Sequence, residues 1–312
     1  MATVLITGGT GLIGTALTQQ LVEKGYDVII LTRRIPLDQS RFSWLKSKVR
    51  YAKWDVEQQT IDPIAIRNTD YLVHLAGANV GDRRWTSKRK REIVNSRVQS
   101  GNLLVKALTE IPNNIKTIIS ASGIGYYGPD PEVPNHHPFT ETDTNYNDFL
   151  GSTCRQWEDV IQPVTQLEKR LVIFRTGIVL SKKAGAFPEF LKPLKFRTAT
   201  ILGSGKQIVS WIHISDITQL YMTALENEDW KGVYNAVAPG FISNKQLIKT
   251  IAKKAHKLHV TLHVPSFVLK MVLGELSVEV LKSATVSSAK LQANGYKFLY
   301  PQIDNAIADL IA

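Results

Sequence analysis

Short apolar runs recur along the first 180 residues and alternate with segments of helical periodicity. The runs are Val4-Leu5-Ile6, Val28-Ile29-Ile30-Leu31, Tyr71-Leu72-Val73, Thr117-Ile118-Ile119 and Leu171-Val172-Ile173-Phe174. Continuous runs of this length are typical of strands buried on both faces of a parallel sheet. Between the first two runs, Leu12, Ala16, Leu17 and Leu21 form one stripe of a helix that we expect to end at Gly25. The alternation predicts an α/β fold with a Rossmann-type doubly wound parallel sheet.

The pattern loosens after about residue 180. Prolines and glycines interrupt the next stretch at Pro188, Pro193, Gly203 and Gly205. Helical patterns resume from Ile214 and from Asn244, and a last block runs from Pro265 to the end. We therefore predict a Rossmann domain over 1–180 and a smaller mixed α/β substrate domain over 181–312. Residues 213–230 are expected to fold back onto the first domain.

The composition is that of an ordinary globular protein, with 44% hydrophobic and 21% charged residues among 312. No run approaches the roughly 18 apolar residues of a membrane span, and a strand-like run from Thr3 leaves no room for a signal peptide. Cys154 is the single cysteine, so no intramolecular disulfide and no cysteine-based zinc site can form. We expect a cytoplasmic protein with no membrane partner.

The net charge of +11 favours anionic partners such as nucleotides or phosphorylated metabolites. Basic residues are densest over 83–91, which indicates either a solvated helix face or a binding surface. Nucleic acid is the less favoured partner, because Trp85 is the only aromatic residue there for bases to stack on. Nothing in the sequence indicates an oligomeric state.

A glycine-rich segment follows the first apolar run directly. Gly8, Gly11 and Gly14 stand at intervals of three between a predicted strand and a predicted helix. In Rossmann folds such glycines permit a tight turn, let the backbone approach a pyrophosphate and let the helix pack against the strand. The helix N-terminus then offers N–H groups to the phosphates. A purely structural turn is the alternative, but the full context favours a dinucleotide site made by Gly8, Thr10, Gly11, Leu12, Ile13 and Gly14.

The end of the second predicted strand indicates which dinucleotide is bound. Proteins that bind NAD usually place an acid there for the ribose 2′-hydroxyl. Here the strand ends Thr32-Arg33-Arg34, and an arginine pair can hold a 2′-phosphate through charge-assisted hydrogen bonds. We predict NADP(H) as the cofactor. The alternative is that both arginines are ordinary surface residues.

Further motifs connect the chain to a known family. They are Asp55-Val56, His74-Leu75-Ala76-Gly77-Ala78, Asn95, Ser120-Ala121-Ser122 and Arg175-Thr176-Gly177-Ile178-Val179. With the glycine segment, they resemble the extended and atypical short-chain dehydrogenases/reductases. A narrower resemblance is to the little-characterised "epimerase family" of NADP-dependent oxidoreductases with a C-terminal domain of unknown function. It rests on Arg84-Trp85-Thr86, Gly125-Tyr126-Tyr127-Gly128, Trp211-Ile212-His213-Ile214-Ser215-Asp216, Tyr234-Asn235-Ala236-Val237-Ala238-Pro239 and Gly295-Tyr296-Lys297-Phe298.

The resemblance implies roles for individual residues around the cofactor. Thr32 and Arg33 would sit at the 2′-phosphate, and Asp55 and Val56 would border the adenine. The ribose side would be lined by Leu75, Ala76 and Gly77, with Glu92 and Arg97 within reach of the dinucleotide. Other interpretations stay open for some of them. Leu75 and Ala76 suit a plain core, and Glu92 could be only an ion-pair partner of its basic neighbours.

The resemblance fails at the catalytic pair. Typical members use Tyr-x-x-x-Lys beside a serine: the tyrosine transfers the proton, and the lysine lowers its pKa and holds the nicotinamide ribose. Ser122 matches the serine. Leu150 falls at the tyrosine position and Cys154 at the lysine position beside the cofactor. Leucine carries no transferable proton, and a neutral thiol supplies no fixed positive charge.

Other groups could replace the pair. Tyr126 is the best candidate for proton transfer, although a phenol with a pKa near 10 needs a cation beside it. Arg155 is shifted by one place and would point elsewhere. Cys154 could be a nucleophile, but a buried, inert cysteine is the commoner case. We expect a structural role for His213 and Asp216, and we predict no metal site at His136-His137.

Two functions remain open. The first is an NADP-dependent oxidoreductase or epimerase that acts on a small, sugar-like or anionic substrate. The second is a non-catalytic NADP(H)-binding regulatory or scaffold protein that has lost the pair. We expect the loops over 128–148 and 181–212 to determine the substrate.

Overall fold

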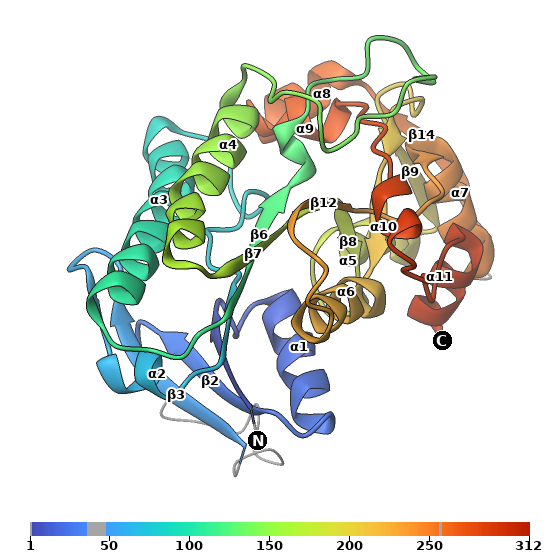
Figure 1. Cartoon of the computed structure of the whole chain (residues 1–312). Helices are drawn as coiled ribbons and strands as arrows, with labels where there is room; N and C mark the ends of the chain where they lie inside the picture. Colours follow the sequence, from blue (N-terminus) through green and yellow to red (C-terminus); the bar gives the residue numbers. More distant parts are fainter. Residues whose placement is uncertain (1, 36–47, 256–257) are drawn as a thin grey trace.

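The computed structural model describes residues 2–35, 48–255 and 258–312. Its centre is an eight-stranded sheet in the order β12-β7-β6-β5-β1-β2-β3-β4 (Figure 1). These strands are β1 (Thr3–Thr7), β2 (Asp27–Thr32), β3 (Val49–Asp55), β4 (Thr60–Ile61), β5 (Tyr71–His74), β6 (Thr117–Gly123), β7 (Arg170–Thr176) and β12 (Gly232–Ala236). Every neighbouring pair is parallel except β3 and β4. The predicted Rossmann-type doubly wound sheet is confirmed.

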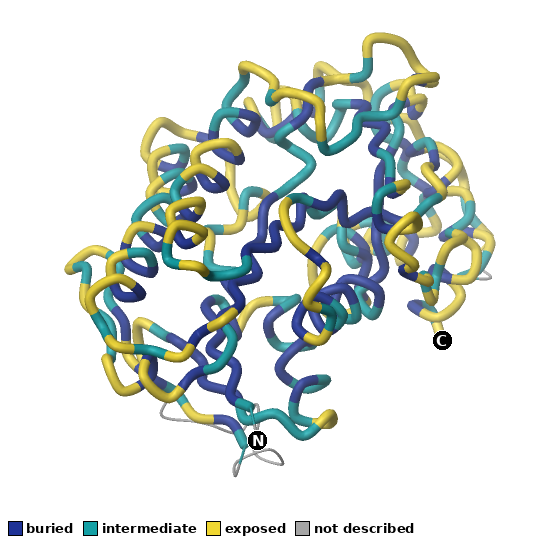
Figure 2. Tube along the Cα trace, in the orientation of Figure 1, coloured by how far each residue is buried: buried dark blue, intermediate teal, exposed yellow. Residues whose placement is uncertain are grey.

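Helices cover both faces of this sheet, because successive strand residues point to opposite sides. Leu5 and its neighbours pack under α2 (Pro63–Arg67), α3 (Ser87–Glu110) and α4 (Phe149–Ile161). Val4 and Ile6 pack under α1 (Leu12–Glu23) and α6 (Ile214–Glu226) on the other face. The strands are the most continuously buried part of the chain (Figure 2).

The second half of the chain is only partly separate from this layer. Both α6 and β12 follow residue 180, yet α6 packs on α1 and β12 pairs with β7. The boundary at 180 therefore stays a prediction. The remaining elements surround a third core formed by Phe187, Trp211 and Leu247 with their neighbours. They are β8 (Ile178–Leu180), α5 (Ala186–Leu191), β9 (Thr198–Leu202), β10 (Ile208–Val209), β11 (Trp211–His213), β13 (Ile242–Ser243), α7 (Asn244–Lys254), β14 (Val260–Val264) and α11 (Ile303–Ile311). The short helix α10 (Ala289–Ala293) instead places Leu291 in the core beneath α1 and α6.

Two helices of the C-terminal half reach back to the first domain. They are α8 (Ser266–Leu273) and α9 (Leu276–Leu281), drawn near the top of Figure 1. Arg84 Nη2 donates to the Met271 carbonyl oxygen at 3.1 Å, and Lys90 pairs with Glu275. Leu276 joins a small apolar cluster with Trp85 and Ile93. Part of the basic stretch over 83–91 thus holds the C-terminal segment in place.

Two further properties concern only the described residues. None of their helices is long and apolar enough to cross a membrane. Cys154 is a free, buried cysteine.

Candidate functional site

The glycine segment forms the turn between β1 and α1, and each glycine is required for a different reason. Gly8 has φ +68°, and a Cβ there would lie 2.9 Å from the carbonyl carbon of Leu75. A Cβ at Gly14 would lie 2.3 Å from the Gly8 carbonyl oxygen. At Gly11 the nearest atom to such a Cβ is the Gly8 oxygen, at 3.2 Å. Gly8 and Gly14 thus permit close packing, whereas at Gly11 the contact with the Gly8 oxygen would be tight but less severe.

The N-terminus of α1 is open to an anion. Gly11 is the N-cap residue, and no side chain caps this end of the helix. Its first turn carries no acidic residue. Uncapped N–H groups and the positive end of the helix dipole favour phosphate. Thr10 is exposed in the turn, and Leu12 and Ile13 are half-buried at the start of the helix.

The residues predicted at the adenosine half lie at the carboxyl ends of β2 and β3. Thr32 Oγ1 donates to the Arg34 carbonyl oxygen at 2.8 Å and so shapes the turn, while Arg33 and Arg34 are exposed. Asp55 Oδ1 accepts from the backbone N–H groups of Glu57 and Gln58, both at 3.0 Å. Val56 packs against the core beneath α3. The Asp55 carboxylate therefore organises the turn after β3.

The loop after β5 packs against the glycine turn. The N–H groups of Leu75 and Ala76 both donate to Thr7 Oγ1 at 3.1 Å. Leu75 also packs on the core beneath α1, and Ala76 packs on the core beneath α3. Gly77 lies directly against Arg97, whose Cζ would be 3.0 Å from a Cβ at that glycine. The two loops together form a continuous edge next to the N-terminus of α1.

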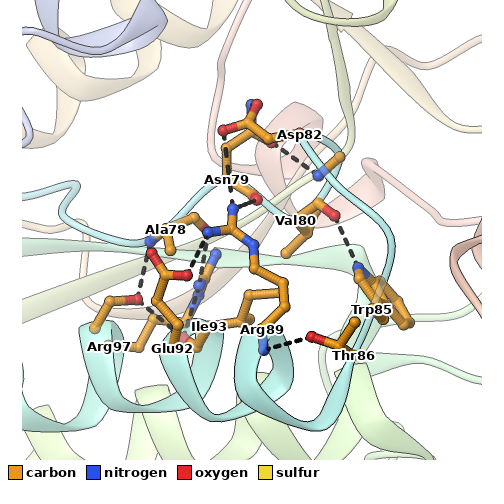
Figure 3. Close-up of polar contacts among 12 residues, drawn as sticks. Ala78, Asn79, Val80, Asp82, Trp85, Thr86, Arg89, Glu92, Ile93 and Arg97 are labelled. Atoms are coloured by element: carbon orange, nitrogen blue, oxygen red, sulfur yellow. Dashed lines mark hydrogen bonds and ion pairs between the residues drawn. The ribbon is translucent and has the colours of Figure 1, made fainter.

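Two buried arginines of α3, Arg89 and Arg97, donate hydrogen bonds to backbone carbonyl oxygens of this loop (Figure 3). Arg97 Nη1 donates to the carbonyl oxygens of Ala78 at 3.1 Å and Ile93 at 2.9 Å. Arg89 donates to the Asn79 carbonyl oxygen and forms an ion pair with Glu92 at 2.7 Å. Glu92 is itself exposed, and the Arg89 bond, followed by the charges of Arg89, Arg83 and Arg33, lowers its pKa. Glu92 is thus an ion-pair partner on the side of the helix that faces Arg33.

His74, at the end of β5, is fully buried behind the same loop. Its Nδ1 shares a hydrogen bond with Thr7 Oγ1 at 2.8 Å, and Trp157 Nε1 donates to its Nε2 at 3.4 Å. Burial, and then the nearby charge of Arg97, lowers the pKa of His74 to about 3. The imidazole is therefore neutral at physiological pH.

Leu150 and Cys154, at the two positions where the resemblance places the catalytic pair, are both buried on α4. Leu150 is buried against Gly125, where a Cβ would lie 3.1 Å from the leucine Cβ. Cys154 is buried against Gly123, with Sγ 3.8 Å from the corresponding Cβ position. Burial raises the pKa of the Cys154 thiol to about 11, against the opposing charge of Arg97. A neutral thiol does not favour a nucleophilic role, and Arg155 points outward to pair with Asp159 at 3.4 Å.

Ser122 belongs to a buried polar chain that the sequence did not reveal. Ser122 Oγ donates to Glu158 Oε1 at 2.6 Å. The Nε and Nη2 groups of Arg175 donate hydrogen bonds to the same carboxylate, both at 2.8 Å. Arg175 also donates from Nη1 to the Tyr127 hydroxyl at 2.9 Å. The Tyr127 hydroxyl in turn donates to Asn235. A clue existed, since Arg175 interrupts an otherwise apolar strand, but its partners are distant in the sequence.

Tyr126 lies against the same arginine. The Cζ of Arg175 is 3.4 Å from the centroid of the Tyr126 ring. Among the described residues, no hydrogen-bond partner is present for the Tyr126 hydroxyl. The tyrosine therefore has a cation against its ring and a hydroxyl that remains available to a ligand.

Asp130, which the sequence did not single out, ties the loop after Tyr127 to the C-terminal segment. Its carboxylate accepts hydrogen bonds from Ser283 Oγ at 2.7 Å and from the N–H and Oγ1 of Thr285, both at 2.8 Å. Lys282, the residue before Ser283, donates to the Tyr127 carbonyl oxygen at 3.2 Å. Part of the loop over 128–148 is thus held at the carboxyl ends of β6 and β7.

His213 and Asp216 have structural partners. His213 caps α6 and lies 3.3 Å from Asp309 of α11. The Asp216 carboxylate accepts from the N–H groups of Leu299 at 2.7 Å and Tyr300 at 3.0 Å. Across 2–35, 48–255 and 258–312, no group of three His, Cys, Asp or Glu residues could hold a metal ion.

Comparisons with known proteins agree with this architecture. The model of the NAD dependent epimerase/dehydratase family matches residues 4–236, and a domain of unknown function, DUF1731, matches 264–310. An epimerase family protein of Staphylococcus saprophyticus is 34% identical over 98% of both chains. One of Staphylococcus aureus is also 34% identical, over 99% of this chain and 98% of its own.

Solved structures show the same likeness. The human epimerase family protein SDR39U1, solved with NADPH, is 29% identical with a TM-score of 0.86 and covers 99% of both chains. A nucleoside-diphosphate sugar epimerase from Corynebacterium glutamicum is 31% identical with a TM-score of 0.76, over 99% of this chain and 58% of its own. UDP-glucuronic acid 4-epimerase from Bacillus cereus, at 20% identity and a TM-score of 0.80, shares the fold. This chain therefore belongs to the NAD dependent epimerase/dehydratase family.

Proposed function

We propose that this protein binds NADP(H) and is an oxidoreductase or epimerase of a small, sugar-like or anionic substrate. The observation that carries the proposal is the uncapped N-terminus of α1, which begins after Gly11 and lies at the same sheet edge as the exposed Arg33 and Arg34. The solved human relative with NADPH supports this cofactor. When bound, the dinucleotide would supply the carrier for hydride transfer.

Individual residues would divide the work of holding the cofactor. The N–H groups at the start of α1 would receive the pyrophosphate. Arg33 and Arg34 would bind the 2′-phosphate, because a guanidinium forms strong charge-assisted bonds with phosphate oxygens. The loop from Leu75 to Gly77 would border the ribose side. These assignments fit a site with two exposed arginines and an uncapped helix N-terminus.

Proton transfer cannot come from the apolar residues Leu150 and Cys154 of α4, and Tyr126 is the candidate for it. Its hydroxyl is available to a ligand, and the Arg175 guanidinium lies against its ring, 3.4 Å from the ring centroid. Ser122 would orient the substrate through a lone pair, because its proton points to Glu158. The positive net charge of +11 supports an anionic substrate.

A panel of carbonyl compounds and sugar nucleotides, followed by NADPH absorbance, tests this activity. We expect at least one compound to be turned over, with Tyr126→Phe slower by about 10²- to 10⁴-fold. Ser122→Ala is expected to raise KM more than it lowers kcat. Full activity in both variants would contradict the site. The matched control is Tyr71→Phe, at the first residue of β5 and so at the opposite edge of the sheet.

A second function is favoured by one observation, the apolar contacts of Leu150 and Cys154. A protein that binds NADP(H) without catalysis needs no proton donor there. If NADPH binds tightly and no compound of a broad panel is turned over, this regulatory or scaffold function replaces the first. Activity that appears only in Leu150→Tyr with Cys154→Lys would support the same conclusion.

A further inference from the structure

The strand β14 is exposed over most of its length and lies at the edge of a small sheet. In the part of the chain that the structure describes, it pairs with β9 alone, and the two strands lie beside α7 at the periphery (Figure 1). Four of its five residues are exposed. This is unusual, because a strand normally packs at least one face on a core. The exposure indicates a surface that another strand could cover.

The pairing with β9 shows which backbone groups of β14 face outward. The Val260 N–H donates to the Arg197 carbonyl oxygen at 2.9 Å, at the β9 side. Alternate residues of a paired strand turn their N–H and C=O groups to opposite sides, so Thr261 and His263 turn theirs away from β9. Among the described residues, no hydrogen bond reaches the backbone of Thr261 or His263. These groups therefore form a free edge, ready to pair with another strand.

The sequence of β14 does not protect this edge. Edge strands are commonly protected by charged side chains, by a proline or by a bulge. The strand reads Val260-Thr261-Leu262-His263-Val264, with no Lys, Arg, Asp or Glu, and the nearest proline, Pro265, stands just after its end. Two copies of the strand would therefore bring no acidic pair and no pair of lysines or arginines together along the edge.

Apolar side chains are exposed beside this edge. Val260 and Leu262, two residues apart and so on one face of the sheet, are 72% and 54% exposed. Leu258 and Phe196, just before the two strands, are 88% and 84% exposed. These four side chains expose roughly 500 Å² on each copy, so two copies can bury at most about 1,000 Å², near the lower limit of a specific interface. An association through them should therefore be weak and depend on concentration.

We propose that two copies of this chain pair through β14, antiparallel and about a twofold axis at Leu262. The outward groups determine the register: Thr261 of one copy pairs with His263 of the other, and each such pair exchanges two backbone hydrogen bonds. Leu262 then faces its own counterpart, and Val260 faces Val264, so apolar side chains meet on one face. The match is self-complementary, as a twofold interface requires, and so favours a second copy over an unrelated strand. The inference does not depend on the proposed function.

The oligomeric state of the full chain tests this pairing. Sedimentation velocity, from low micromolar to several hundred micromolar protein, should show a dimer whose fraction rises with concentration. In Leu262→Lys two ammonium groups would face each other at the axis, so the dissociation constant of the dimer should rise by about 10-fold or more. Val278→Lys, on a similarly exposed side chain of α9, is the matched control and should associate as wild type does.

Cross-linking tests the register. Cys154 is buried, so a cysteine introduced on β14 would be the exposed thiol of the chain. With oxidised glutathione as the oxidant, Leu262→Cys should join two copies by a disulfide, because residues that face each other in a non-hydrogen-bonded pair lie close enough for one. His263→Cys should cross-link several-fold more slowly, since position 263 faces Thr261. A wild type that stays monomeric, a Leu262→Lys variant that associates like wild type, or equal cross-linking of both cysteine variants would overturn the inference.

Discussion

The turn after β1 and the inner face of α4 differ in one respect, since only the turn keeps what the proposed function requires of it. In the turn, Gly8, Gly11 and Gly14 provide backbone geometry and an uncapped helix end. On α4, Leu150 and Cys154 fill the two catalytic positions with apolar contacts. Phosphate binding depends on backbone shape, whereas proton transfer depends on particular side chains. The first can therefore persist while the second is lost or moved to another element.

The largest expected effect comes from closing the open position in the turn. In Gly11→Val the side chain would fill the space that the pyrophosphate needs, so NADPH binding should fall by about 100-fold or more. The backbone of Gly11, at φ −76° and ψ −178°, is one that any residue adopts, and the Gly8 oxygen, 3.2 Å from the new Cβ, would have to move by only a few tenths of an ångström. Calorimetry and circular dichroism measure binding and fold in the same sample.

Gly14→Val is the matched control for this variant. Its side chain would collide with the Gly8 oxygen, so we expect loss of folding stability and not a selective loss of binding. A folded Gly11→Val protein that still binds NADPH would show that the turn is not the phosphate site.

The next largest effect is expected from breaking the buried polar chain beside α4, and it is a loss of folding stability. Glu158→Ala leaves the Arg175 guanidinium buried without its carboxylate, which should lower the free energy of unfolding by about 3–5 kcal/mol. Asp159→Ala, on the same helix but in an exposed pair with Arg155, should cost no more than about 0.5 kcal/mol. Urea denaturation compares the two. Equal losses would mean that the buried pair contributes no more than the surface pair.

A smaller effect is expected from pH, through His74 beneath the loop after β5. Its pKa is about 3 in the folded protein and near 6.5 when unfolded, so the unfolded chain binds the proton first as pH falls. The stability that His74 contributes is complete above pH 6.5 and is lost toward pH 3. Between pH 6.5 and 5 the loss should be about 2 kcal/mol. In His74→Gln the slope of stability against pH over this range should become shallower, and an unchanged slope would contradict the assignment.

The sequence predicts those parts of the molecule that local patterns encode. Buried strands appear as apolar runs, and the turn after β1 appears as glycines at fixed spacing because each glycine serves its own neighbourhood. The sequence also shows Leu150 and Cys154 at the two positions where the resemblance expects the catalytic pair, four residues apart on one helix face. The parallel, doubly wound arrangement of the sheet followed from the rhythm of the elements, whereas the order of its strands was not predicted.

The sequence does not reveal contacts between distant segments. Asp130 bonds to Thr285, 155 residues away, and Arg84 to Met271, 187 residues away. The partners of the basic stretch over 83–91 could likewise not be predicted from the sequence. Its charge suggested a solvated face or a ligand, but Arg89 is buried and Lys90 holds Glu275. Whether an arginine is buried depends on segments that pack on it later in the chain.

The preference for NADPH over NADH tests the central claim most directly. Fluorescence titration of wild type should give an affinity for NADPH about 10- to 100-fold higher than for NADH, equivalent to about 1.5–3 kcal/mol. In Arg33→Ala this difference should largely disappear, while Arg67→Ala, on α2 away from the carboxyl edge, should retain it. Equal affinities in wild type, or NADPH binding unchanged in Arg33→Ala, would contradict the account.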